Sequence, residues 1–266
     1  MKIALIGGGN MGEAMLSAIG DKGLAAAGDI TVSDVSEPRR QYLSRTHGVK
    51  VTADNRQAVA AAEVVVLAVK PQHLAEVMAG LKGRLASGQL LLSIVAGARI
   101  DTLRAGLGHD RIVRVMPNTP AQIGEGMSVW TATAGVTALQ KERAGAILGA
   151  MGKQLYVTDE DDIDKATAVS GSGPAYIFYF VEALTAAAEG LGLPPDTAAG
   201  LVRQTLAGSA HFLEKSGKEP AELRRMVTSP GGTTAAALAR LEEGQFAGLV
   251  REAVAAAYRR AKELGG

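Results

Sequence analysis

The sequence predicts an α/β fold in which a doubly wound, mostly parallel sheet is followed by an all-helical domain. In the first half of the 266 residues, short aliphatic runs alternate with stretches of helical length, an order typical of such sheets. After Ile163 the chain shows no further strand pattern. We therefore expect a first domain over residues 1–160 and a helical domain over residues 161–266, both of ordinary domain size.

Continuous apolar runs mark the strands of the first domain, because parallel strands are buried on both faces. The segments between these runs have helical length and composition, as in Met11–Lys22 and Pro71–Leu85. A further pair of strands is expected around Gly126–Thr131 and Gln154–Val157. The principal expected strands are Lys2–Ile6, Ile30–Ser33, Val64–Ala68, Leu90–Ile94 and Ile112–Met116.

The helical domain opens with a segment that is apolar nearly all round. Pro174 suits the first turn of a helix, and the composition of Ala175–Leu191 predicts a fully buried helix. About a hundred residues of helix barely surround such a segment, so we expect an obligate dimer that buries it against a second copy. Further helices are expected over Asp196–Lys215, Pro220–Val227, Thr233–Glu243 and Phe246–Leu264.

Composition excludes several classes of function. The net charge of +1 gives no electrostatic reason to expect nucleic acid or an anionic membrane surface as partner. The chain has no cysteine, which excludes disulfides and thiolate chemistry. The N-terminus lacks a signal-peptide pattern and the longest aliphatic run, Val64–Val69, is too short to span a membrane. We expect a cytoplasmic protein.

No metal site is expected. The acidic run Asp159–Asp162, with Asp164 beyond it, lacks the central glycine and terminal glutamate of a calcium loop. Negative residues at a helix start account for it more simply. The four histidines show no ligand spacing.

A glycine-rich turn follows the first expected strand and opens a helix. Its spacing, Gly7-x-Gly9-x-x-Gly12 with Asn10 and Met11 between, is that of a dinucleotide-binding loop. The first glycine permits the tight turn, the second lets a pyrophosphate approach the backbone, and the third lets the helix pack on the strand. The plain alternative is a strand–helix turn without a ligand.

Asp34 ends the second strand, where an acid accepts hydrogen bonds from the adenosine ribose of NAD. The same acid repels the 2′-phosphate of NADP, whereas Arg39 and Arg40 follow closely and attract it. The alternative makes Asp34 a helix cap and the arginines a solvated face. The expected cofactor is therefore NADPH or NADH.

The turns after the third, fourth and fifth strands should line the same ligand, because open parallel sheets bind ligands at the carboxyl ends of their strands. Lys70 is a candidate acid, although a role in holding ribose or loop carbonyls is favoured. The candidate cofactor contacts in these turns are Ala68, Val69, Lys70, Pro71, Ala96, Gly97, Pro117 and Asn118.

A second anion-binding turn lies near the C-terminus, in the stretch Thr228–Thr234 with the sequence Thr-Ser-Pro-Gly-Gly-Thr-Thr. It precedes an Ala/Leu-rich helix, whose free N–H groups and dipole attract a carboxylate or phosphate. A cofactor loop combined with a small-anion loop suggests a redox enzyme that acts on a small acid.

Taken together, these motifs resemble the pyrroline-5-carboxylate reductase family over essentially the whole chain. The resemblance rests on Gly-Gly-Gly-Asn-Met-Gly, Ala-Val-Lys-Pro, Met-Pro-Asn-Thr-Pro, Ser-Gly-Ser-Gly-Pro-Ala-Tyr and the signature segment Pro220–Glu242. It implies a Rossmann domain followed by a dimerisation domain. It also implies reduction of 1-pyrroline-5-carboxylate to L-proline by NAD(P)H, in dimers that often form decamers.

The resemblance also implies residue roles. Thr234 matches the threonine that hydrogen-bonds the substrate ring nitrogen, and Gly232 and Thr233 match positions whose amides hold its carboxylate, with Ser229 and Gly231 beside them. Glu160 matches a glutamate near the product. Asn55, Val69, Lys70 and Ala96 match cofactor contacts.

Two positions depart from the family pattern. Asp34 stands where many members have a small hydroxyl residue, which places NADP preference in doubt, and Met226 stands where some have a polar substrate contact. The rivals are another Rossmann reductase of imines or β-hydroxyacids and a non-catalytic nicotinamide-binding regulatory module. The helix from Pro174 has no lysine before Lys215, unlike hydroxyacid dehydrogenases, and a sensor needs no substrate anchor. Whether the loop serves the cofactor of its own subunit or of its partner stays open.

Overall fold

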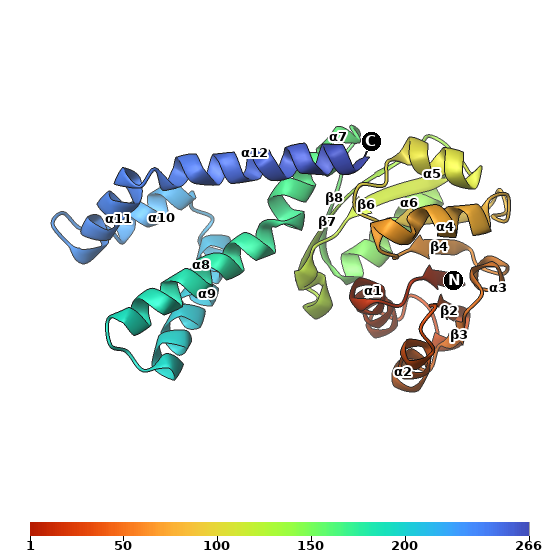
Figure 1. Cartoon of the computed structure of the whole chain (residues 1–266), viewed down its shortest axis with the longest axis horizontal. Coiled ribbons are helices and arrows are strands. Elements are labelled where there is room, and N and C mark those ends of the chain that lie inside the picture. Colours follow the sequence, from red (N-terminus) through yellow and green to blue (C-terminus); the bar gives the residue numbers. More distant parts are fainter. Residues whose placement is uncertain (266) are drawn as a thin grey trace. The chain divides into compact units, whose positions relative to one another are not determined.

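The computed structural model describes residues 1–265 and divides into two compact units (Figure 1). The first unit holds residues 1–172 together with the end of the chain from Ala257, and the second holds residues 173–256. The division follows Ser172 because helix α7 (Asp161–Ala166) packs against the sheet of the first unit. The domain boundary at residue 160 stays a prediction, and Gly266 lies outside the described residues.

The first unit is built on an eight-stranded sheet with the order β3-β2-β1-β4-β5-β6-β7-β8. Strands β1 to β6 are parallel, β7 is antiparallel to β6, and β8 is parallel to β7. The chain order reverses between β1 and β4, which makes this the switch point of the doubly wound sheet. The strands are β1 (Ile3–Ile6), β2 (Ile30–Ser33), β3 (Lys50–Thr52), β4 (Val64–Leu67), β5 (Leu90–Ser93), β6 (Ile112–Met116), β7 (Gly126–Ala132) and β8 (Gly152–Tyr156).

The predicted mostly parallel sheet is confirmed, and all seven expected strands are present within a residue or two of their expected ends. The sequence did not indicate β3. This strand has three residues, none of them fully buried, and lies at the edge of the sheet. A short edge strand needs no apolar run, so it leaves no pattern to detect.

Alternate strand residues feed two separate hydrophobic cores, one on each face of the sheet. Ile3 and Leu5 of β1 join the core under α1 (Asn10–Asp21), α2 (Glu37–His47) and α6 (Ala138–Ala150). Ala4 and Ile6 join the core under α3 (Asn55–Val59), α4 (Pro71–Leu81) and α5 (Ile100–Leu107). Figure 1 shows these helices on the two sides of the sheet. Covering both faces explains why the strands are continuously apolar.

Local signals set the helix ends in this unit. Ser36 caps α2 by accepting a hydrogen bond from the Arg39 amide, and Thr137 and Gln140 form a capping box at α6. Three short helical segments complete the unit: the 3-10 turns η1 (Ala27–Asp29) and η2 (Thr119–Ile123), and the π-helical η3 (Thr167–Gly171) after α7.

The second unit is helical throughout, which confirms the expected change of class. No strand follows β8 in the described part of the chain. Gly192 and Pro194 lie between α8 and α9, and α12 ends with residues that belong to the first unit. The helices are α8 (Gly173–Gly190), α9 (Pro195–Ser216), α10 (Pro220–Met226), α11 (Thr233–Glu243) and α12 (Phe246–Gly265).

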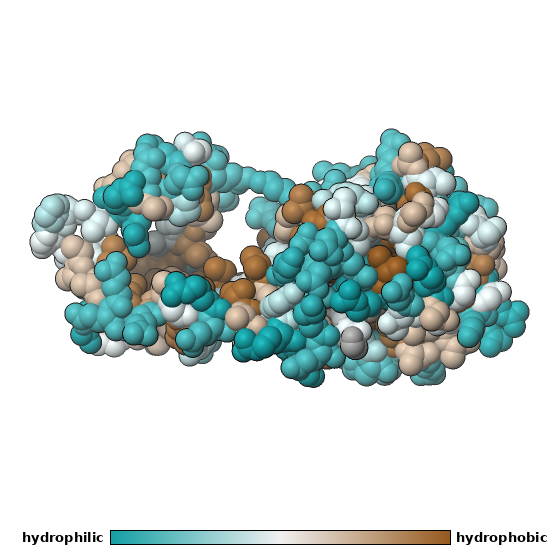
Figure 2. All heavy atoms as spheres, turned by 90° about the horizontal axis from the view of Figure 1, so that it is seen from above, coloured by the Kyte–Doolittle hydropathy of each residue, from teal (hydrophilic) through white to brown (hydrophobic). Residues whose placement is uncertain are grey.

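Helix α8 is not buried within its own chain, which agrees with the expectation that the helical domain is too small to surround it. None of its residues is classed as buried, and Phe178 and Tyr179 are 65% and 73% exposed. The helix packs against α9 in a hairpin, and a single neighbour covers only one side of an all-round apolar helix. Figure 2 shows brown, apolar surface over the helical unit. An exposed apolar surface of this kind marks an interaction site.

None of the described helices is both long enough and apolar enough to cross a membrane.

Candidate functional site

The glycine-rich turn between β1 and α1 has three glycines with different constraints. Gly7 has a φ of +101°, and a Cβ there would lie 2.7 Å from the Ala68 carbonyl oxygen. A Cβ on Gly12 would collide with the Gly7 carbonyl oxygen. At Gly9, by contrast, a Cβ would meet no atom within 4 Å. Gly7 and Gly12 therefore close the turn, whereas Gly9 keeps its outer side open.

The same turn leaves the start of α1 free for an anion. Gly9 is the N-cap residue and contributes no side-chain cap, so the first amides of the helix lack an internal partner. Gly9 and Asn10 are exposed, and Met11 is half-buried. An uncapped helix start beside an open glycine fits a pyrophosphate, which needs N–H donors and close approach to the backbone.

Asp34 lies directly beside this turn and is already engaged by the backbone. Its Oδ2 accepts a hydrogen bond from the Gly8 amide at 2.8 Å, and its Oδ1 accepts one from the Ser36 amide at 2.8 Å. The acid therefore fixes the end of β2 against the glycine turn. Each oxygen keeps a second lone pair for a ribose hydroxyl.

Arg39 is drawn inward rather than left free. Its Nε donates to the Gly8 carbonyl at 2.5 Å, and its guanidinium forms an ion pair with Glu13 at 2.5 Å. Partial burial raises the pKa of Glu13, but hydrogen bonds from Arg39 and His47 outweigh it and hold that pKa below its ordinary value. The predicted phosphate contact of Arg39 stays a prediction, because this side chain already serves the turn.

Arg40 occupies the outer side of the same region. Its guanidinium donates to the backbone carbonyls of Asp34 and Val35, at 2.7 and 3.0 Å. The side chain of Val35 is 95% exposed. A cation held at the end of β2 is placed to attract a 2′-phosphate, in competition with the charge of Asp34.

The remaining candidate cofactor contacts lie at the carboxyl edge of the sheet. Ala68 to Pro71 follow β4, Ala96 and Gly97 follow β5, and Pro117 and Asn118 follow β6, which are neighbouring strands. Asn55 begins α3 and accepts a hydrogen bond from the Ser33 hydroxyl at 2.6 Å. The exposed Lys70 is the N-cap residue of α4. The structure thus gathers the candidates of the first unit along one edge of the sheet.

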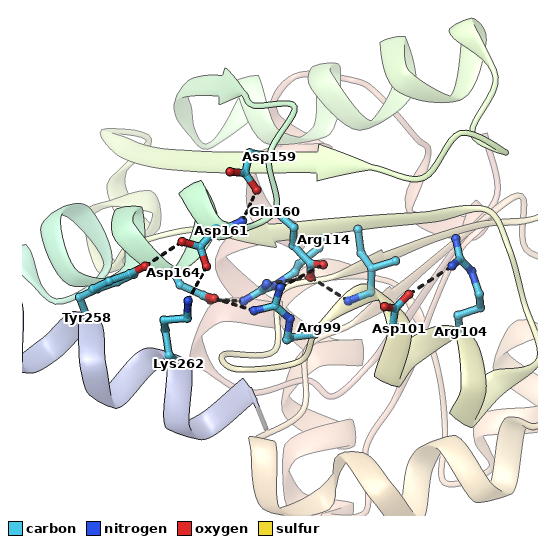
Figure 3. Close-up of polar contacts among 11 residues, drawn as sticks. Arg99, Asp101, Arg104, Arg114, Asp159, Glu160, Asp161, Asp164, Tyr258 and Lys262 are labelled. Carbon is cyan, nitrogen blue, oxygen red and sulfur yellow. Dashed lines mark hydrogen bonds and ion pairs between the residues drawn. The ribbon is translucent and has the colours of Figure 1, made fainter.

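A charge cluster lies farther along this unit, formed by the buried Arg114 and Asp164 and the partly exposed Arg99 and Glu160 (Figure 3). Arg114 of β6 has a side chain that is only 3% exposed, and it pairs with Glu160 at 2.8 Å and with Asp164 at 2.5 Å. Removing one partner from a buried pair typically costs about 3–5 kcal/mol. The Glu160 carboxylate is therefore committed to protein partners, and its predicted contact with substrate stays a prediction.

Sequence reasoning did not select Arg99 or Arg114, and it took Asp164 only as part of the acidic run at a helix start. One signal was present, because Arg114 interrupts the apolar strand Ile112–Met116. A charged residue in a strand that is buried on both faces needs a buried partner of opposite charge. Nothing local identifies that partner, since Asp164 lies 50 residues further along the chain.

The small-residue turn before α8 packs closely against the sheet. Gly171, in the π-helical segment η3, would place a Cβ 2.8 Å from the Met116 methyl carbon. The lack of a side chain at Gly171 therefore allows this segment to pack closely against the end of β6.

In the second unit, Ser229 to Thr234 form a turn that opens α11. Gly231 has a φ of +72°, and the Gly232 amide donates to the Ser229 carbonyl at 3.1 Å. Gly232 is the N-cap residue without a side-chain cap, so the amides of Thr233 and Thr234 lack internal partners. Thr234 is half-buried and Met226 is exposed. The turn has the donors and the dipole to bind a carboxylate.

The described residues contain no group of three or more histidines or acids that could hold a metal ion.

Comparison with known proteins gives a consistent result in both halves of the chain. A family model described as "Pyrroline-5-carboxylate reductase dimerisation" matches residues 160–264, and one described as "NADP oxidoreductase coenzyme F420-dependent" matches residues 2–97. Among curated proteins, the chain is 45% identical to pyrroline-5-carboxylate reductase from Pseudomonas aeruginosa, over 99% of this chain and 96% of that protein.

Solved structures show a similarity of the same kind over the full length of the chain. A pyrroline-5-carboxylate reductase from Coxiella burnetii is 40% identical with a TM-score of 0.92, covering 100% of this chain and 98% of that one. The Plasmodium falciparum pyrroline carboxylate reductase with NADP bound is 31% identical with a TM-score of 0.91, again over 100% and 98% of the two chains.

Proposed function

The chain belongs to the pyrroline-5-carboxylate reductase family, and from this premise we propose the roles of its two units in reducing 1-pyrroline-5-carboxylate to L-proline. The protein is an NAD(P)H-dependent oxidoreductase of proline biosynthesis. The observation that carries the assignment of roles is that α1 and α11 each begin at a glycine N-cap residue that follows a glycine turn, with no side-chain cap. One fits a dinucleotide and the other fits a small carboxylate.

We assign cofactor binding to the first unit. The amides of the α1 start hold the pyrophosphate above Gly9, and Asp34 binds the adenosine ribose. The turns after β4, β5 and β6 surround the nicotinamide half. When bound, NAD(P)H supplies the hydride. The opposed charges of Asp34 and Arg40 support the use of both NADH and NADPH.

We assign substrate binding to the turn that opens α11. The amides after Gly232 bind the carboxylate, and the Thr234 hydroxyl hydrogen-bonds the ring nitrogen. The imine carbon receives the hydride while the nitrogen keeps the proton that it carries as an iminium, so the C=N bond becomes CH–NH. The residues orient the two reactants, and no nucleophile or metal is needed for this chemistry.

The protein is a homo-oligomer through its helical unit. The unburied apolar residues of α8 support the finer proposal of a two-fold dimer, which in turn can assemble as five dimers into a decamer. A cytoplasmic location, where NAD(P)H is available, completes the proposal.

The direct test is the initial rate of 1-pyrroline-5-carboxylate reduction by the purified full chain, with NADH and NADPH side by side. With either cofactor, one molecule of proline should form for each molecule of NAD(P)H that is oxidised. A chain that binds NAD(P)H but turns over no imine would instead be a regulatory nicotinamide-binding protein. Turnover of a different imine or hydroxyacid alone would make it another Rossmann reductase.

A further inference from the structure

The loop between β5 and α5, residues Ile94 to Arg99, is held from two sides by parts of the chain that lie far away in sequence. Ala96 and Gly97 of this loop are the candidate nicotinamide contacts after β5. The loop ends where α5 begins, and the N-cap residue Arg99 provides no side-chain cap. Under the proposed function, the contacts that hold this loop in place therefore also affect cofactor binding.

On one side, Glu160 supplies the missing cap. Its Oε1 accepts a hydrogen bond from the amide of Ile100, the first residue of α5, at 2.8 Å. This amide is one of the donors that a helix start leaves without a partner. Glu160 thus caps α5 from outside the helix and fixes the end of the loop.

The carboxylate of Glu160 is itself held in place by the charge cluster. The guanidinium of Arg114 donates to the same Oε1 at 2.8 Å, and Arg99 lies 3.8 Å from Oε2. Asp164 balances the charge by pairing with both arginines. Figure 3 shows Glu160 between the two arginines and the start of α5.

On the other side, the last turn of α12 closes against the loop. A Cβ on Gly97 would lie 2.8 Å from the Leu264 carbonyl oxygen, so only glycine fits at this contact. Gly97 also has a φ of +76°, which glycine adopts without strain. Tyr258 and Lys262 of α12 bind the Asp161 carboxylate beside Glu160, at 2.7 and 3.0 Å. The C-terminal turn and Glu160 therefore clamp the loop together.

We propose that Glu160 is a positioning residue for NAD(P)H binding, because it fixes the loop Ile94–Arg99 through the Ile100 amide. The inference rests on the proposed function only in taking this loop as a nicotinamide contact. It differs from a direct contact of Glu160 with substrate, in which the acid would act on the imine and leave the free cofactor complex unchanged.

The test measures the dissociation constants of NADPH and NADH, without imine, for the wild-type chain and for Glu160→Ala by fluorescence titration. Loss of the cap should raise the Kd of the preferred cofactor by about tenfold, within the range that cap removal costs. The Kd of ADP-ribose, which lacks the nicotinamide, should change less than about twofold because its contacts lie at α1 and β2.

Two conservative variants keep the test decisive if Glu160→Ala does not fold. Glu160→Gln retains an oxygen for the Ile100 amide and should bind NAD(P)H nearly as tightly as the wild-type chain. Glu160→Asp keeps the charge beside Arg114 but withdraws the oxygen from Ile100, and should weaken binding. Asp162→Ala is the control, because Asp162 lies two residues after Glu160, in α7, and its carboxylate pairs with Lys165, away from the loop.

The outcomes separate the alternatives. Folded Glu160→Asp or Glu160→Ala with wild-type Kd for NAD(P)H would overturn the proposal, whether or not the melting temperature falls. A rise confined to the KM for imine would also overturn it and would favour direct substrate contact. A wild-type chain that binds NAD(P)H without reducing any imine would refute the proposed function while leaving this binding test intact.

Discussion

Helices α1 and α8 are both rich in apolar residues, but α1 buries half of its residues in its own chain whereas α8 buries none of them. Helix α1 buries half of its twelve residues, among them Met15, Leu16 and Ile19, in the core on one face of the sheet. Helix α8 has eighteen residues and none of them is buried. The first unit completes its cores with its own chain, whereas the second leaves an apolar surface for another copy to cover.

The two units also differ in how they meet a ligand. In the first, tight backbone packing fixes the glycine turn, and Asp34 and Arg39 tie it to β2 and α2. In the second, the turn before α11 is largely exposed, and no side chain from another element is hydrogen-bonded to it in the described part of the chain. The comparison predicts that the first unit binds cofactor independently of assembly, whereas the substrate half depends on it.

The largest effect is expected from a charge placed on the apolar surface of α8. Phe178→Glu would place an unpaired charge in the proposed dimer interface, which costs about 3 kcal/mol or more and weakens dimerisation by at least about 100-fold. Light scattering should show a monomer at micromolar concentration, with imine reduction lost. NAD(P)H affinity should stay within about twofold of wild type.

Glu189→Gln, at an exposed position near the end of the same helix, serves as the control and should remain dimeric. A Phe178→Glu chain that still dimerised and turned over imine would show that α8 is not the covered surface.

A smaller effect is expected from Gly9→Ala in the cofactor turn. The added methyl meets no protein atom within 4 Å, so the melting temperature should not change. It would nevertheless stand where the pyrophosphate approaches, which should raise the Kd of NAD(P)H by about tenfold. Gly20→Ala, an equally open glycine at the other end of α1, should leave this Kd unchanged. If Gly9→Ala bound NAD(P)H as tightly as Gly20→Ala, the pyrophosphate would not bind at the start of α1.

Cofactor preference gives the next prediction. Asp34→Ser removes a negative charge from the end of β2 while Arg40 stays in place, so the ratio of kcat/KM for NADPH over that for NADH should rise by about fivefold. Glu37→Gln removes the same charge from an exposed position on α2 and should not alter this ratio. An unchanged ratio in Asp34→Ser would mean that this carboxylate only supports the glycine turn.

The smallest predicted effect is a dependence of stability on pH. Because the pKa of Glu13 is lowered in the folded chain, its contribution to stability is complete above the ordinary value of 4.5 and is lost as the pH falls through the folded value. Glu13→Gln should therefore reduce the fall in melting temperature below that pH. If the melting temperature of Glu13→Gln fell with decreasing pH as much as that of the wild-type chain, the pair of Glu13 with Arg39 would add no stability.

Much of the first unit was predictable because its signals are local. The all-buried runs of β1 and β4 mark parallel strands, and the spacing of Gly7, Gly9 and Gly12 reports backbone constraints within one turn. The same local logic located the turn before α11.

The features that were missed depend on contacts across long stretches of sequence. Arg114 meets Glu160 across 46 residues, and Arg99 meets Asp164 across 65. For α8 the apolar pattern alone fits either a buried helix in one chain or a surface covered by another, and only the small size of the helical domain favoured a second copy. A pattern records that burial is needed, not which chain provides it.

The central claim is that the second unit binds the imine while the first binds the cofactor, and Thr234→Ala tests it most directly. We predict that kcat/KM for 1-pyrroline-5-carboxylate falls by about 10- to 1000-fold, the range for removing an orienting hydrogen bond, while the Kd of NAD(P)H stays at the wild-type value. Thr205→Ala, at an exposed position on α9, should leave both quantities unchanged. Full kcat/KM in Thr234→Ala would contradict the account.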